Sequence, residues 1–164
     1  MKQDLQTRTS IMSFQEIMMQ GQKTGDVPDD MDKTYLEHHF TPLDEKYGCH
    51  TYARQIFMPK DMVLVGKLHK KAHLTFVLQG TVDVVSEAGG KQRITAPSTF
   101  VSPAGVKRVF HVLEDTLLTT VHLTEDMGEE NLGKIEDEVI SPTYKDMGLE
   151  EPDLTDLNKF LSQK

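Results

Sequence analysis

The 164-residue chain has one cysteine, no tryptophan and no long apolar run. Because Cys49 has no second cysteine to pair with, an internal disulfide and a zinc site built from several thiolates are both excluded. No segment approaches the roughly 20 apolar residues of a membrane-spanning helix, and residues 1–10 lack the apolar stretch of a secretory signal. These absences predict a soluble, cytoplasmic protein in which any bound metal uses imidazole, carboxylate or water ligands.

Positive charge is scarce as well, and it forms no stripe. The formal net charge is −8, and residues 125–164 hold 12 Asp and Glu against 4 Lys, which accounts for the whole of that charge. We interpret this acidic tail as a solvated face, and we expect neither nucleic acid nor a membrane as partner. The chain also lacks a Walker loop, a dinucleotide fingerprint and a Gly-x-Ser-x-Gly elbow, so no nucleotide or serine-hydrolase chemistry is indicated.

The composition divides the chain into three zones. Residues 1–48 are polar and weakly patterned, and we interpret them as an N-terminal extension. Within it, Ser13 and Glu16 have the spacing of a capping box, which predicts a short helix near 13–20. The segment 21–32 is rich in glycine and aspartate and is predicted to be a loop.

The second zone, residues 49–124, has the rhythm of a β-barrel. β-Branched and aromatic residues are frequent, helical spacing is poor, and turn residues such as Gly80 recur at short intervals. The predicted strands are 51–58, 62–69, 73–79, 81–86, 92–95, 99–102, 107–112 and 116–124. The paired glycines in 88–91 predict a hairpin turn. About eight short strands at regular spacing predict an antiparallel sandwich or barrel.

The third zone, residues 125–164, returns to helical spacing. Two triplets are spaced i, i+3, i+7, and they are Leu132, Ile135, Val139 and then Leu154, Leu157, Leu161. We therefore predict two short helices whose apolar stripes pack on the barrel or on a neighbouring subunit.

Two motifs in the barrel zone resemble those of the cupin superfamily. The first runs from Gly66 to Gly80 and contains His69 and His73; the second is Pro103-Ala-Gly105-Val-Lys-Arg108. The resemblance covers roughly half of the chain. It implies an all-β, cupin-type double-stranded β-helix (jelly roll) over 49–124, with short helices before and after it. Small cupins commonly pair through their sheets, so it also implies a homodimer.

The departures from the cupin motifs fall on the metal-ligand positions. The resemblance places the second histidine of the first motif on His69 and the glutamate on His73, whereas the first histidine is replaced by Lys67 and the histidine of the second motif by Arg108. A narrower likeness, carried by Tyr52–Pro59 and by the two motifs, is to small cupins encoded by tailed bacteriophages. It implies a protein made in the cytoplasm of a bacterial host.

Strand geometry indicates which side chains share the barrel cavity. Because side chains alternate between the faces of a strand, Lys67 and His69 share one face. The resemblance directs that face, His73 and Arg108 into the barrel. Two imidazoles alone make a weak metal site, but His122 in the last strand could supply a third.

Three interpretations remain open at this stage. In the first, His69, His73 and His122 hold a divalent zinc, iron or nickel ion in a metal-dependent enzyme that acts on a small molecule. In the second, no metal is present and the cavity binds or sequesters a small anion. The residues for the anion are Lys67, Arg108, Thr75 and Gln79. In the third, the barrel is a scaffold for phage assembly. The sequence does not decide whether the protein is an enzyme.

Overall fold

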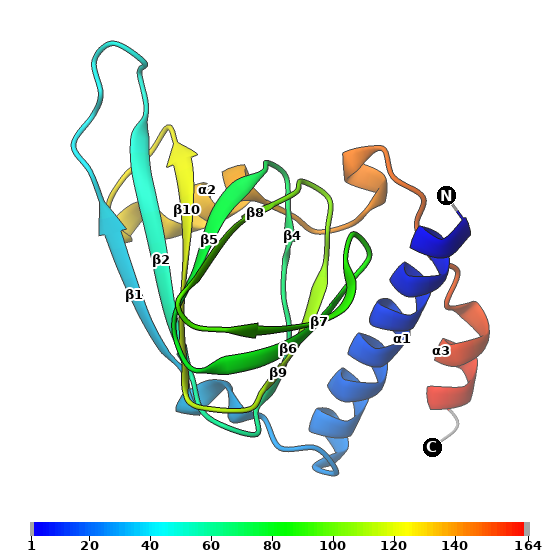
Figure 1. Cartoon of the computed structure of the whole chain (residues 1–164). Helices are drawn as coiled ribbons and strands as arrows, with labels where there is room; N and C mark the ends of the chain where they lie inside the picture. The colour runs from blue at the N-terminus through cyan, green and yellow to red at the C-terminus, as the bar shows by residue number, and fades with distance from the viewer. Residues whose placement is uncertain (1, 163–164) are drawn as a thin grey trace.

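The computed structural model describes residues 2–162 (Figure 1). Two antiparallel sheets face each other and enclose the core. The five-stranded sheet has the order β1-β2-β10-β5-β8, and the four-stranded sheet has the order β3-β9-β6-β7. The strands of the five-stranded sheet are β1 (Tyr35–Phe40), β2 (His50–Met58), β10 (Thr116–Thr124), β5 (His73–Gln79) and β8 (Ser98–Ser102). Those of the four-stranded sheet are β3 (Val63–Val65), β9 (Arg108–Val112), β6 (Thr81–Ser86) and β7 (Gly90–Thr95). The predicted all-β, cupin-type jelly roll is confirmed.

The chain crosses between the two sheets at Gly80. This glycine has φ +83°, and a Cβ there would lie 2.4 Å from the carbonyl oxygen of Asp115. Only glycine fits this position, because an L side chain would be strained in φ and would collide with backbone. The next turn, predicted at 88–91, joins β6 to β7, and Ser86 pairs with Gly90 across it. Strong turn residues thus fixed both connections.

The buried apolar side chains come from both sheets. Alternate residues of each strand point inward, as the two-residue period of a strand requires. The core cluster consists of Ile56, Met58, Met62, Val77, Val82, Val84, Val112 and Leu118. It fills one end of the barrel and leaves polar side chains at the other.

The N-terminal extension differs from its prediction in two ways. The helix α1 spans Lys2–Thr24 rather than 13–20, and the side chain of its Ile11 is buried. β1 lies within the extension and pairs with β2 along its whole length, from Tyr35 opposite Phe57 to Phe40 opposite Tyr52. The division of the chain at residues 48 and 124 stays a prediction. In the structure, the five-stranded sheet also includes β1, which comes from the first zone.

Both predicted helices of the tail are present. Helix α2 (Leu132–Val139) buries Ile135 and Val139, and the following β11 (Ile140–Ser141) pairs with β4 (Leu68–His69). Helix α3 (Thr155–Leu161) lies beside α1, away from the sheets (Figure 1). Short 3-10 turns, η1 (Asp30–Lys33), η2 (Glu129–Asn131) and η3 (Lys145–Met147), complete the fold.

Candidate metal and anion site

A cavity of about 330 Å³ lies between the sheets at the polar end of the barrel. Its deeper walls are apolar, with Leu64, Phe100 and Phe110 among them, and the inner face of α2 adds Ile135 and Val139 at the mouth. The volume is at the small end of the roughly 300–1,000 Å³ that is usual for ligand pockets. The cavity therefore suits a small molecule.

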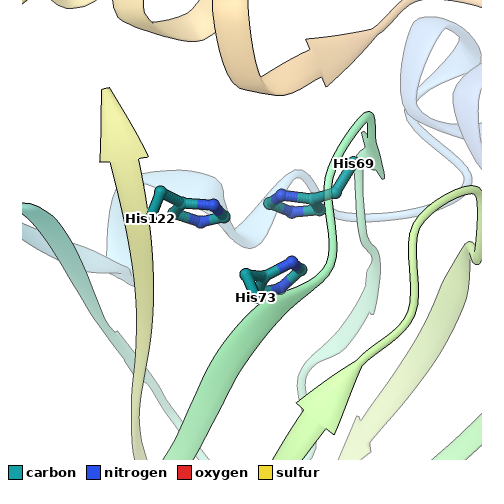
Figure 2. A group of neighbouring side chains, drawn as sticks. All are labelled: His69, His73 and His122. Carbon is teal, nitrogen blue, oxygen red and sulfur yellow. The ribbon is translucent and has the colours of Figure 1, made fainter. Parts of the chain in front are cut away.

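Three histidines meet in this cavity (Figure 2). His69 ends β4, His73 begins β5, and His122 lies on β10, which pairs directly with β5. One nitrogen of each ring lies within 4.8 Å of the others, and the ring centroids are 4.2–5.0 Å apart. The pairing of β10 with β5 thus brings His122, which is distant in sequence, to the same point as His69 and His73, as the strand alternation predicts.

The hydrogen bonds of the three rings leave nitrogens available for a ligand. His73 Nδ1 lies 3.3 Å from the carbonyl oxygen of Lys71; because a carbonyl only accepts, this nitrogen carries the proton and Nε2 has the free lone pair. His69 Nδ1 is buried and has no hydrogen-bond partner among the described residues. A buried polar atom without a hydrogen-bond partner destabilises the folded state, so this nitrogen is a candidate to bind a ligand.

The three imidazoles are neutral at physiological pH. Burial lowers the pKa of His69 to about 2, with further contributions from the neighbouring His73 and His122. Burial, followed by His73, lowers the pKa of His122 to about 4. Burial also lowers the pKa of His73. Neutral imidazole is the form that binds a metal, so the site does not have to lose protons first.

The metal-free protein is expected to lose stability as the pH falls below about 6.5, the ordinary pKa of histidine. The lowered pKa values mean that the unfolded chain takes up protons first, so acidification favours unfolding by up to about 1.4 kcal/mol per pH unit for each group. Urea midpoints of the chelator-treated protein between pH 7.5 and 4.5 measure this. His69→Asn should have a shallower slope than the wild type; equal slopes for the two proteins would contradict the prediction.

Two arginines enter the cavity from opposite sheets. Arg54 comes from β2 and Arg108 from β9, and both are half-buried. Neither guanidinium group forms a hydrogen bond or an ion pair with another described residue; the Cζ of Arg108 lies 6.0 Å from the centre of the Phe100 ring. Burial lowers the pKa of both guanidinium groups, which nevertheless stay charged. Two unpaired cations therefore face one small cavity.

Lys67 is at the rim rather than deep in the cavity. Its side chain is mostly exposed and forms an ion pair with Glu136 of α2. The sequence predicted that Lys67 faces inward with His69, and it does line the cavity, but its charge already has a partner. Lys67 is thus less available for a ligand than either arginine.

Of the two polar residues predicted on β5, one lines the cavity and the other does not. Thr75 is buried and shares a hydrogen bond of 2.8 Å with Ser102. Gln79 is exposed and donates to the carbonyl oxygen of Asp115. Six residues along a strand span about 20 Å, so Gln79 lies near the opposite end of the barrel from His73, beyond a register shift at Leu117. Gln79 thus has the same strand parity as His73 but lies too far along the strand to line the cavity.

The helix α2 closes the mouth of the cavity over the histidines (Figure 2). Two consecutive lysines in the turn after β4 hold it there. Lys70 donates its backbone N–H to Val139 and its Nζ to the carbonyl oxygen of Asp137, and Lys71 forms an ion pair with Glu138. The tail is therefore part of the site, not only a solvated appendage.

Sequence reasoning missed four residues of the site. Arg54 and Tyr52 share the parity of the buried Ile56 and Met58, so alternation along 50–58 could have identified them. His38 lies on β1, where its Nδ1 is 2.8 Å from the Tyr52 hydroxyl. No sequence pattern showed that Glu136 reaches the cavity, because helical periodicity defines a face but not where it docks.

No family model matches the chain, and neither does any curated protein. Among solved structures, KdgF from Halomonas sp. is similar with 19% identity and a TM-score of 0.46, over 63% of this chain and 88% of that one. The cupin domain of Schizosaccharomyces pombe Cnp3 has 21% identity and a TM-score of 0.42, over 62% and 69%. A cupin 2 conserved barrel domain protein from Leptotrichia buccalis has 9% identity and a TM-score of 0.47, over 63% and 46%.

These likenesses concern the fold. Within the described residues, no helix is long and apolar enough to cross a membrane.

Proposed function

We propose that this cupin-like protein holds a divalent transition metal at His69, His73 and His122, and a small anionic molecule beside it. The observation that supports it most is the convergence of three neutral imidazoles with the partnerless Nδ1 of His69. Three histidines with open positions suit zinc, iron or nickel. Their nitrogens, now within 4.8 Å, would need to draw closer, because ligands at about 2.0–2.1 Å from zinc lie at most about 4.2 Å apart.

Different residues around the cavity would orient the metal ligands, bind the anion and exclude water. The carbonyl oxygen of Lys71 fixes the tautomer and orientation of His73, as outer hydrogen bonds do for many metal-binding histidines. Arg108 and Arg54 would hold anionic groups of the ligand. The apolar walls and α2 would keep bulk water away, and a bound metal would supply Lewis-acid or redox chemistry.

Metal reconstitution tests the proposal. Chelator-treated protein is incubated separately with zinc, ferrous iron and nickel, passed through a desalting column and analysed for metal. We expect about one equivalent per chain for at least one of the three metals. A content below about a tenth of an equivalent for all of them would exclude a metal site of useful affinity.

The alternative is a metal-free module that binds a small anion, and the two unpaired arginines favour it specifically. Under this alternative, the chelator-treated protein binds its ligand as tightly as the metal-loaded protein does. A ligand that binds only after metal is added would argue against it. The resemblance to phage-encoded cupins, and with it a role in phage assembly, stays a prediction.

A homodimer is the proposed assembly. The outer face of the five-stranded sheet carries exposed apolar side chains, among them Leu74, Val101 and Leu123. A patch of this kind commonly marks an interaction surface, and a second copy would cover it. Light scattering distinguishes a dimer from a single 18.6 kDa chain.

A further inference from the structure

The two unpaired arginines are far apart on the barrel wall. Arg54 begins a row of paired residues that crosses the five-stranded sheet from β2 to β8; the row is Arg54, Thr120, Thr75 and Phe100. Arg108 extends from the facing sheet to the other end of this row, where it lies over Phe100. Three strand spacings, about 14 Å along the sheet, separate the two ends. A ligand in the cavity therefore meets a guanidinium group from each of two sides.

The histidines lie between these two ends. His122 is on β10 and His73 on β5, which are the two strands between β2 and β8. His122 follows Thr120 by two residues, and His73 precedes Thr75 by two residues on the antiparallel strand, so the imidazoles form the next row toward the mouth. A molecule that reaches from Arg54 to Arg108 would pass beneath this row, against the position of a bound metal.

The residues that line the cavity carry an excess of positive charge. The lining contains three cations, Arg54, Lys67 and Arg108, and one carboxylate, that of Glu136, which pairs with Lys67. The two arginines remain without compensation, and a divalent metal would add to the excess. A partly buried charge is stable only when it is paired or solvated. One negative charge on the ligand would leave at least one arginine without a partner.

The space between the arginines is small and mostly apolar. The cavity holds about 330 Å³, and Ile56, Met58 and Leu118 form part of its floor. Such walls favour a short carbon skeleton over a sugar with many hydroxyl groups, because each buried hydroxyl needs a hydrogen-bond partner.

We propose that the ligand is a short-chain dianion, with one anionic group held by Arg54 and the other by Arg108. The anionic groups are carboxylates or phosphates joined by a small carbon skeleton. This inference rests on the proposed function for the presence of a small anion in the cavity, and it adds the number and separation of the charges. Arg54 is the specificity residue, because without it the cavity would accept a monoanion equally well.

Calorimetric titration with matched probes tests the proposal. Succinate and glutarate are compared with butyrate and valerate, which have the same chain lengths and one carboxylate less. 3-Phosphoglycerate tests whether phosphate replaces one carboxylate. We expect the better dicarboxylate to bind at least about tenfold more tightly than its monocarboxylate partner, because each arginine–carboxylate pair is a charge-assisted, bidentate interaction.

Two variants assign the effect to the arginines. Arg54→Gln and Arg108→Gln should each reduce the dicarboxylate preference to about twofold or less, since one anionic group then has no partner. Arg93→Gln removes the same charge from an exposed ion pair with Asp83 outside the cavity, and should keep the full preference. Because Arg54 has no protein partner to lose, its variant should fold, which a thermal melt checks; Arg54→Lys provides a second variant that retains the charge.

The result that would overturn the inference is equal affinity of the wild type for mono- and dicarboxylates, or no binding of any dianion at millimolar concentration. An unchanged preference in Arg54→Gln would do so as well. Metal content measured on the same samples keeps the two proposals separate. Protein that binds metal without preferring dianions contradicts this inference alone, whereas protein that binds dianions without metal contradicts only the metal site.

Discussion

Replacing His122 with alanine is expected to reduce the zinc affinity of the protein by more than about a hundredfold. Loss of an outer hydrogen-bond partner of a metal ligand already costs 10- to 100-fold, and His122 would be one of only three ligands. The remaining pair, His69 and His73, sits among arginines that repel a divalent cation. Competition titration with a chromogenic zinc chelator measures the change.

His111→Ala is the matched control. It lies on β9, is exposed and points away from the cavity, opposite Val63 and Asp83. It should retain the affinity of the wild type. Equal affinities of His122→Ala and wild type would show that zinc binds elsewhere or uses only two imidazoles.

The second large effect is expected on folding, at a buried ion pair that joins the two ends of the chain to the barrel. Arg8 of α1 donates to Glu87 at 2.9 Å, and both side chains are at least nine-tenths buried. Glu87 also accepts from the hydroxyl of Tyr144, and Arg8 stacks on the Tyr144 ring. One carboxylate thus ties α1 and the tail to the turn between β6 and β7.

Glu87→Ala should lower the free energy of unfolding by about 3–5 kcal/mol, because it leaves a buried guanidinium without its counter-ion and a buried hydroxyl without its acceptor. Asp83→Ala breaks the exposed pair with Arg93 and should cost about 0–1 kcal/mol. Urea unfolding measures both. The double replacement of Arg8 with Met and Glu87 with Leu should recover part of the loss. A Glu87→Ala protein as stable as Asp83→Ala would show that this pair does not hold the ends in place.

The barrel could be predicted from sequence where local signals were strong. β5, β6 and β10 match the predicted ranges 73–79, 81–86 and 116–124, because β-branched alternation and well-defined turns bound them. The predicted strand 62–69 is instead two strands, β3 and β4. The chain leaves the ladder there at Gly66, whose N–H donates to the carbonyl oxygen of Arg108.

Strand parity also predicted which histidines share the cavity. It did not predict how far along β5 the cavity extends, or where α2 packs. It could not tell that Gln79 lies near the opposite end of the barrel, since alternation fixes the face on which a side chain lies and not its position along the strand. Nor could it show that α2 covers the mouth, because this depends on the pairing of β11 with β4, a contact between segments some 70 residues apart.

The most direct test of the central claim is anomalous X-ray diffraction from crystals of zinc-loaded protein, recorded on both sides of the zinc absorption edge. We predict a single strong anomalous peak per chain, about 2.0–2.1 Å from one nitrogen each of His69, His73 and His122. The absence of a peak between these rings, or a peak only at another site, would contradict the assignment of this cavity as a metal centre.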